Sequence, residues 1–302
     1  MDAIFTERLT KSFDGRANAL DTLSITVPEG AAFALLGGNG AGKTTAVKLL
    51  AGLLTPTSGY SEILGVNPMK KSARLHKVCG VVTPSARMYA CMTGQENLAF
   101  FGEAAGMKNT DAQTRTAELM KELGIWQARD LPVSEFPTGM LQRLSLARAL
   151  MTHPRVLLLD EPTVGLDTEG AEAMVGVISG LVKKEGVTVF LCTHHFLYAQ
   201  QLCTEYGILS KGSLIAGGTL EVLCRKAGCR IRAGFRLPPQ DALGGFTQGA
   251  DDFWEKEIEQ EEEMPELLRR AVAEGHDIYE ARLCRPTLAD AYMALLGKER
   301  SL

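Results

Sequence analysis

Residues 37–45 combine glycines with a lysine and two threonines at a spacing that suits phosphate binding. They fit the pattern Gly-x-x-x-x-Gly-Lys-[Ser/Thr], in which the glycines let successive backbone N–H groups point inward at an anion. Lys43 would contact the β- and γ-phosphates of a nucleotide, and the Thr44 hydroxyl would ligate Mg²⁺. The residues expected to bind the nucleotide are Gly37, Gly38, Asn39, Gly40, Ala41, Gly42, Lys43, Thr44 and Thr45.

Two adjacent carboxylates, Asp160 and Glu161, follow the apolar run 156–159. Asp160 would hold Mg²⁺ through its water ligands, and Glu161 would polarise the water that attacks the γ-phosphate. An isolated Asp-Glu pair usually marks an ordinary helix or loop boundary. Behind a phosphate-binding loop, the pair instead predicts the metal-binding and catalytic groups of a nucleotide hydrolase.

Apolar runs and helical patterns supply the elements that would position these groups. Residues 31–36 form a short apolar run suited to a buried parallel strand, and residues 45–52 continue as a helix closed by glycine. The runs 156–159 and 187–192 are suited to further buried strands. This alternation of strands and helices predicts a parallel sheet with its ligand-binding groups at the carboxyl ends of the strands.

Further motifs make the chain resemble, over most of its length, the nucleotide-binding subunits of ATP-binding-cassette (ABC) transporters. The matching pieces are Phe13, residues 37–45, residues 93–98, residues 136–143, residues 159–162, residues 165–167 and the pair Thr193-His194. The resemblance implies an α/β fold with a P-loop NTPase core of the ABC ATPase type, an N-terminal β-subdomain and an inserted helical subdomain. It also implies a small C-terminal α+β module, as in drug- and ion-exporting members.

The resemblance implies roles for residues outside the two chemical motifs. Phe13 would stack on adenine, and His194 would contact the γ-phosphate during catalysis. Thr138 and Gly139 in the signature loop, and Asp167 at the end of the D-loop, would also contact nucleotide. Plainer interpretations stay open, because Phe13 could be a core or edge-strand aromatic and His194 could satisfy a backbone carbonyl. His195 is assigned no role.

Two positions depart from the family pattern. The family usually has a glutamine near Pro84 that touches Mg²⁺ and signals to the membrane subunit, so metal coordination on that side would fall to water, with Ser85 as a further oxygen. In the signature loop, Pro137 stands at the family's serine position and Thr138 at its first glycine. We expect a weaker clamp on nucleotide but an intact helix, because proline is tolerated in a helix's first turn.

The resemblance also suggests how the chain is divided. We expect an ATPase domain at residues 1–224, with its helical subdomain at 86–140, and a C-terminal module at 225–302. The N-terminal β-subdomain would begin with strands at residues 4–9 and 23–27.

Four more segments carry expectations of their own. Residues 77–82 are expected to form a strand and residues 171–184 a helix. Residues 286–293 resemble the closing helix of drug- and ion-exporting family members. The run 251–266 holds nine carboxylates and one lysine, and is expected to be a solvated strand and linker.

The composition limits the class of protein. A formal net charge of −4 over 302 residues argues against a protein that coats nucleic acid. The seven cysteines contain no Cys-x-x-Cys pair, a pattern typical of reduced thiols in a cytosolic protein. No apolar stretch approaches the ~18 residues of a membrane span, so any membrane link is expected to come through a partner.

The leading hypothesis is an ATP-hydrolysing subunit that binds ATP and Mg²⁺ and powers export through a separate integral membrane permease. It would pair with a second ABC subunit, the same or different, and lie in the cytoplasm against the inner face of the cell membrane. One alternative is a soluble ABC ATPase acting on nucleic acid or the ribosome, which the acidity opposes. Another is a non-catalytic or weakly hydrolysing regulatory subunit, which Pro84 and Pro137 favour and the intact Lys43 and Glu161 oppose.

Overall fold

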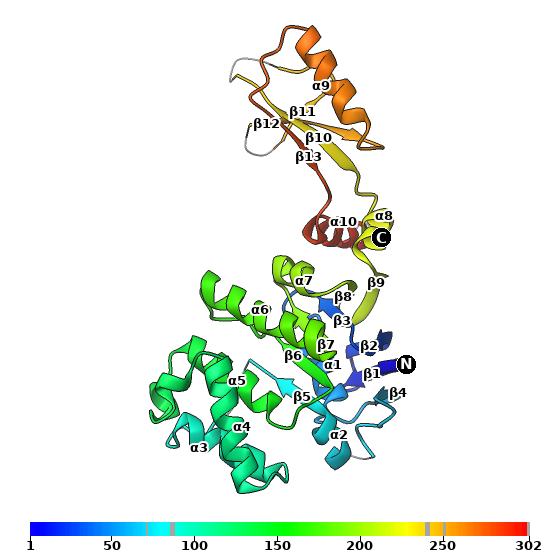
Figure 1. Ribbon diagram of the computed structural model, residues 1–302. Helices are drawn as coiled ribbons and strands as arrows, with labels where there is room; N and C mark the ends of the chain where they lie inside the picture. Colours follow the sequence, from blue (N-terminus) through cyan, green and yellow to red (C-terminus); the bar gives the residue numbers. More distant parts are fainter. Residues whose placement is uncertain (71, 85–87, 239–241, 250–251, 301–302) are drawn as a thin grey trace. The chain divides into compact units, whose positions relative to one another are not determined.

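The computed structural model describes residues 1–70, 72–84, 88–238, 242–249 and 252–300 (Figure 1). Ser85 and residues 86–87 of the expected helical subdomain lie outside these ranges. Contacts within the chain divide it into two units, Met1–Thr219 and Leu220–Leu302. The expected boundary lay a few residues later, and helix α8 (Leu220–Ala227) therefore belongs to the second unit.

The first unit is built on a nine-stranded sheet in the order β4-β1-β2-β9-β8-β3-β7-β6-β5 (Figure 1). Its strands are β1 Asp2–Ser12, β2 Asn18–Pro28, β3 Ala32–Leu36, β4 Ser58–Ile63, β5 Cys79–Val82, β6 Val156–Asp160, β7 Thr188–Thr193, β8 Glu205–Ser210 and β9 Ser213–Gly218. Its α-helices are α1 Lys43–Leu50, α2 Ser72–Val78, α3 Gly94–Ala104, α4 Asn109–Glu122, α5 Thr138–Leu150, α6 Thr168–Glu185 and α7 Phe196–Leu202.

The central strands β3, β7, β6 and β5 are parallel neighbours, as the apolar runs predicted. Every residue of β3, β6 and β7 is buried, which is why these strands read as continuous apolar runs and not as an alternating pattern. The register pairs Leu36 with Thr193 and Asp160 with Cys192. The last residues of three strands therefore meet at one edge of the sheet.

The N-terminal β-subdomain forms as expected. Strand β1 pairs in the antiparallel sense with β2 on one side and with β4 on the other. The two long strands are joined by the turn that contains Phe13, between Ser12 and Asn18. Leu209, at the end of β8, and the first residues of β2 both lie against the phosphate-binding loop.

The strand expected at residues 77–82 is shorter than predicted. Lys77 and Val78 end helix α2, and strand β5 begins only at Cys79. The basic side chains of His76 and Lys77 lie in the last turn of that helix, where positive charge interacts favourably with the helix dipole. At Gly80 in β5 there is no room for a side chain, because a Cβ there would lie 2.3 Å from the Ala149 carbonyl oxygen.

Helices α3, α4 and α5 pack against one another and form the expected helical segment. Helix α3 begins with a capping box, in which the Thr93 hydroxyl accepts from the Glu96 N–H and the Glu96 carboxylate accepts from the Thr93 N–H. Short 3₁₀ turns at Trp126–Ala128 and Val133–Glu135 lead from α4 to α5.

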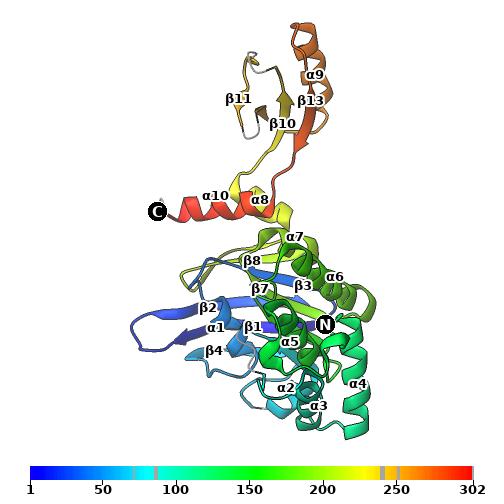
Figure 2. The same ribbon diagram turned by 90° about the vertical axis from the view of Figure 1, so that its left-hand side faces the viewer.

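The second unit is a small α+β module, as expected. Its four strands lie in the order β11-β12-β10-β13, with antiparallel pairing throughout. Figure 2 shows helix α9 along this sheet, and α8 and α10 side by side. The elements are β10 Ile231–Arg236, β11 Thr247–Gln248, β12 Phe253–Ile258, α9 Glu263–Ala273, β13 Glu280–Cys284 and α10 Leu288–Arg300.

The acidic run in this module is more structured than predicted. Glu255 is buried in β12, where Arg232 Nη1 lies 2.8 Å and Arg282 Nη2 lies 3.7 Å from its carboxylate oxygens. Glu263 begins α9, and its carboxylate accepts hydrogen bonds from backbone N–H groups of the preceding turn. The expected strand forms, but the expectation that the run is solvated is wrong at Glu255, because arginines of β10 and β13 neutralise this buried carboxylate. At Glu263 the expected linker is instead the start of helix α9.

Candidate nucleotide site

The phosphate-binding loop joins the carboxyl end of β3 to the start of α1, as the pattern predicted. Two of its glycines touch neighbouring backbone. A Cβ at Gly37 would lie 2.6 Å from the Leu209 carbonyl oxygen, and one at Gly42 would lie 2.4 Å from that of Ala19. Gly42 also has a φ of +109°, which residues with a side chain rarely adopt. The loop therefore needs glycine at both positions to keep its shape.

The loop encloses a cavity of about 230 Å³. It is lined by Ala19, Gly38, Asn39, Gly40, Ala41, Gly42, Lys43, Thr44, Thr45 and Glu161. Eight of the nine loop residues expected to bind nucleotide thus line one cavity, and the ninth, Gly37, accepts a hydrogen bond from Lys43.

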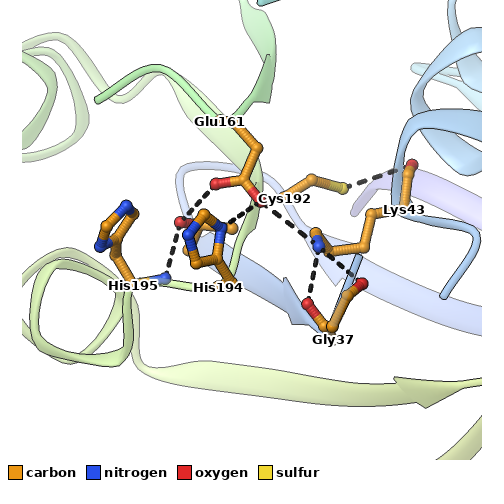
Figure 3. A network of polar contacts seen from close by, with 8 residues as sticks. Gly37, Lys43, Glu161, Cys192, His194 and His195 are labelled. Carbon is orange, nitrogen blue, oxygen red and sulfur yellow. Dashed lines mark hydrogen bonds and ion pairs between the residues drawn. The ribbon is translucent and has the colours of Figure 1, made fainter. Parts of the chain in front are cut away.

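The Lys43 ammonium lies at the centre of a polar network (Figure 3). Nζ donates to the carbonyl oxygens of Gly37 at 2.6 Å and Gly38 at 3.2 Å, and lies 3.3 Å from Glu161 Oε1. Because Lys43 is only 6 % exposed, these partners offset the free energy of burying its charge. The network holds a positive charge at the wall of the loop cavity.

Glu161 directly follows β6, and its carboxylate contacts residues at the end of β7 and just after it (Figure 3). Its Oε1 lies 2.8 Å from His194 Nδ1, and its Oε2 accepts a hydrogen bond of 3.0 Å from Thr193 Oγ1. Burial acts to raise the pKa of the Glu161 carboxyl. The hydrogen bonds from His194 and Thr193 and the charge of Lys43 outweigh that effect, so this pKa lies below its usual value. The group is thereby kept in the ionised form that can accept a hydrogen bond from water.

The carboxylate of Asp160 is fully buried. The side chain is 0 % exposed, and neither oxygen has a hydrogen-bond partner within the described part of the chain. Burial raises the pKa of Asp160, the nearby Thr44 hydroxyl lowers it, and the neighbouring Glu161 carboxylate raises it further. Carboxylate and hydroxyl oxygens are ligands that Mg²⁺ prefers, and a cation would offset the cost of burying this charge. Asp160 and Thr44 therefore fit a magnesium ion.

Phe13 is not a core residue. Its side chain is 65 % exposed in the turn between β1 and β2, with Lys11 Nζ lying 5.3 Å from the ring centroid. The start of β2 lies against the phosphate-binding loop through Ala19 and Gly42. The core alternative is therefore wrong, and an aromatic face is available on the turn that precedes the strand beside the loop.

The signature residues line a second cavity, of about 500 Å³. Pro137 is the N-cap of α5 and makes no side-chain capping hydrogen bond. The helix nevertheless begins at Thr138, as expected because proline is tolerated at the start of a helix. Thr138, Gly139 and Asp167 all line this cavity. It shares no lining residue with the loop cavity among the described residues.

Asp167 has a structural role that the resemblance did not imply. Its Oδ1 accepts a hydrogen bond of 3.0 Å from the Gly170 N–H and caps the N-terminus of α6. Thr138 packs against the same turn, since a Cβ at Gly165 would lie 2.8 Å from Thr138 Cγ2. The signature and D-loop segments are thus joined by packing.

Two residues near Glu161 were assigned no role in the sequence-based prediction, although Thr193 belongs to one of the matching motifs. Thr193 Oγ1 donates to Glu161 Oε2 and accepts from the His195 N–H at 3.0 Å. The ring of His195 lies 4.2 Å, centroid to centroid, from that of His194 (Figure 3). Thr193 could have been found from the sequence, because it directly follows the apolar run 187–192, and the strand formed by that run pairs with β6.

Comparison with known proteins identifies the family. The family model described as ABC transporter matches residues 20–164. The bacitracin transport ATP-binding protein BcrA of Bacillus licheniformis is 31 % identical over 303 residues, which cover 97 % of each chain. This chain belongs to the ABC transporter family. The linearmycin resistance ATP-binding protein LnrL of Bacillus subtilis is 32 % identical to this ABC protein over 222 residues, covering 74 % of this chain and 71 % of its relative.

A solved structure agrees with this assignment. The ATP-binding subunit of an ABC transporter superposes with a TM-score of 0.69 at 26 % identity, covering 75 % of this chain and 94 % of the other. The predicted family and fold are therefore confirmed: the chain is an ABC transporter ATP-binding protein, and by class an ATPase. Of the helices in the described ranges, none is long and apolar enough to cross a membrane.

Proposed function

We propose that this ABC protein is the subunit that hydrolyses ATP with Mg²⁺ and powers export through a separate integral membrane permease. The observation that carries the proposal is the meeting of Lys43, Glu161 and His194 at one edge of the sheet, beside the loop cavity. Names of relatives add support, since two of them are described by bacitracin transport and by linearmycin resistance.

Each residue of this edge has a task that its chemistry suits. Backbone N–H groups of the loop and the Lys43 ammonium would bind the phosphates, replacing the carbonyl partners that Lys43 now has. Thr44 and Asp160 would hold Mg²⁺, which when bound neutralises phosphate charge. Glu161, ionised and held by Thr193, would accept a proton or hydrogen bond from the attacking water.

His194 would act through two contacts. Its Nδ1 lies 2.8 Å from Glu161 and would keep that carboxylate oriented. The side chain is 43 % exposed, so the rest of the ring remains free to contact a γ-phosphate. Phe13, exposed on its turn, would stack on the adenine.

A second ABC subunit would complete the site. The signature residues Thr138 and Gly139 line a different cavity from the phosphate-binding loop, so one chain does not present both surfaces to one nucleotide. We propose that each ATP lies between the loop of one subunit and the signature cavity of another. The other subunit is either a copy of this chain or a different ABC protein.

The permease would dock on an apolar groove of about 460 Å³ beside strand β5. Its lining includes Leu53, Val81, Phe101, Ala105 and Met151. The groove therefore lies between the edge strand β5 and helices α3 and α5. Leu53 is 61 % exposed, and burying such a side chain against a partner is favourable. Docking there would place the chain peripherally on the inner face of the cell membrane.

The experiment measures phosphate release and permease binding together. Wild type and Glu161→Gln would be assayed with ATP and Mg²⁺, and only wild type should turn over.

Leu53→Glu should lose co-purification with the co-expressed permease while keeping ATP binding, because it buries a charge in the groove. Leu131→Glu is the matched control, since Leu131 is 46 % exposed and does not line the groove. Retained permease binding by Leu53→Glu would contradict the docking assignment.

A further inference from the structure

Glu161, His194 and His195 form a cluster of metal-ligating side chains. Each offers one ligand atom, and the three atoms lie within 4.8 Å of one another. His194 directly follows β7 and His195 is the N-cap of α7. Their rings are tilted by 37° at a centroid distance of 4.2 Å (Figure 3). Two imidazole nitrogens and one carboxylate oxygen thus converge on one small volume.

This donor set differs from the one that suits Mg²⁺. Magnesium prefers oxygen ligands, whereas imidazole nitrogen suits Zn²⁺, Ni²⁺ and Cu²⁺. Three protein ligands with water in the remaining positions is the arrangement that open zinc sites use. The Asp160 and Thr44 oxygens and the Glu161, His194 and His195 cluster therefore favour different ions.

Small rotations would bring the three atoms to coordination distance. In a tetrahedral site with bonds of about 2.0–2.1 Å, neighbouring ligand atoms lie about 3.4 Å apart. The His194 side chain is 43 % exposed and His195 is half-buried, so both rings have room to turn. Glu161 is held more firmly, because Thr193 donates to its Oε2 and the same Thr193 oxygen accepts from the His195 N–H. One threonine therefore holds both ends of the cluster.

We propose that Glu161, His194 and His195 bind one divalent transition-metal ion of the zinc and nickel class, and that this ion inhibits ATP hydrolysis. The inhibition rests on the proposed function, because the ion would occupy the carboxylate that activates water and the histidine that contacts the γ-phosphate. The binding does not rest on it. His195, which has no part in the proposed hydrolysis, is the ligand specific to the inhibitory site.

Binding is tested by calorimetric titration of the full chain with NiCl₂ in the absence of nucleotide. Ni²⁺ is chosen because imidazole suits it, while the seven cysteines would compete for Zn²⁺. The variant is His195→Asn, since asparagine is a favourable N-cap residue and suits the start of α7. His153→Asn is the matched control, because His153 is exposed, lies outside the cluster and has a φ of +50°, which asparagine tolerates.

We expect wild type and His153→Asn to bind one Ni²⁺ per chain with equal affinity. His195→Asn should bind at least about tenfold more weakly, because even an outer partner of a metal ligand is worth about 10–100-fold in affinity. Equal affinity in wild type and His195→Asn, or no saturable binding of one ion by wild type, would overturn the proposal.

Inhibition is tested by phosphate release at a fixed, buffered concentration of free Ni²⁺ with excess Mg²⁺. Each variant is compared with its own rate without Ni²⁺. All variants are assayed at the same ATP concentration, so binding of Ni²⁺ by ATP affects them equally. Wild type should lose a larger fraction of its rate than His195→Asn. Equal fractional losses would refute the inhibitory role, whereas Ni²⁺ binding through His195 in a chain that never hydrolyses ATP would refute the proposed function alone.

Discussion

The loop cavity and the signature cavity differ in how their polar groups are satisfied. At the loop cavity, Lys43, Thr193 and His194 each contact Glu161 directly and hold its carboxylate in place. At the signature cavity, helix α5 begins behind Pro137 without a side-chain cap. The first region is assembled by its own contacts, and the second has lost a hydroxyl and an N–H that a serine would provide.

This difference separates the chemistry of hydrolysis from the closing of the site. In the proposed function, the loop cavity holds the groups that would bind phosphate and activate water within one chain. The signature cavity would act on a nucleotide held by another subunit, and there this chain offers less. We therefore expect the chain to work best beside a different ABC subunit whose own signature is intact, with one strong and one weak ATP site.

The largest effect is expected from Glu161→Gln. It keeps the size of the side chain but removes the charge that orients water, and general bases contribute about 10²–10⁴-fold to rate. Steady-state phosphate release should fall by that range, while ATP affinity measured by calorimetry stays near the wild-type value. Hydrolysis at the wild-type rate would mean that Glu161 is not the base and would favour a regulatory subunit.

Lys43→Ala is expected to break the loop cavity at the binding step. Charge-assisted hydrogen bonds contribute about 1.5–3 kcal/mol each, so losing two should weaken ATP affinity about 100-fold or more. Calorimetry with ATP and Mg²⁺ measures the loss. Lys183→Ala is the control, because it removes an exposed lysine from α6 and should bind ATP as wild type does. Equal affinity in Lys43→Ala and wild type would contradict the assignment of the loop.

The loop cavity was accessible to prediction because its signals are local. The glycines and Lys43 follow one apolar run, and Glu161 follows another. Parallel pairing of β3, β7 and β6 then brings the ends together in a register that the rule for α/β sheets anticipates. The residue roles themselves stay predictions, since they concern a bound nucleotide.

What escaped prediction depends on partners distant in sequence. The turn of Lys43 onto Glu161 is a choice of side-chain rotamer, and no local pattern indicates it. Glu255 looked solvated because a charge count ignores which face of a strand a residue occupies. Its neutralisation by Arg232 and Arg282 needs the pairing of three strands. His195 was set aside because a histidine next to a functional one is more often a solvated neighbour.

Pro137→Ser is expected to reduce the difference between the two cavities. Serine would restore a hydroxyl and an N–H near a phosphate oxygen, and one charge-assisted bond of about 1.5–3 kcal/mol corresponds to roughly tenfold or more in rate. We expect weak phosphate release from the isolated chain and a gain of about tenfold in the variant, at matched protein concentration. The gain would be smaller if the Thr138 hydroxyl already supplies the contact that serine would restore.

Pro137→Ala is the control for this gain. Alanine restores the N–H but not the hydroxyl, so its rate should fall between those of wild type and the serine variant. Fast hydrolysis by wild type that serine leaves unchanged would show that the departure in the signature loop has no effect on the clamp.

The smallest effect concerns Asp167, whose carboxylate caps α6 beside the signature cavity. Asp167→Ala should lower the free energy of unfolding of the first unit by about 1 kcal/mol, whereas Asp167→Asn, which keeps a capping oxygen, should not. Urea denaturation followed by Trp126 fluorescence in a Trp254→Phe background reports on the first unit, because Trp254 lies in the second. A nucleotide contact by the charge would instead slow phosphate release in both variants. If Asn and Ala lower stability equally, the capping bond is not what Asp167 contributes, and the packed junction between the signature and D-loop segments must rest on Thr138 and Gly165.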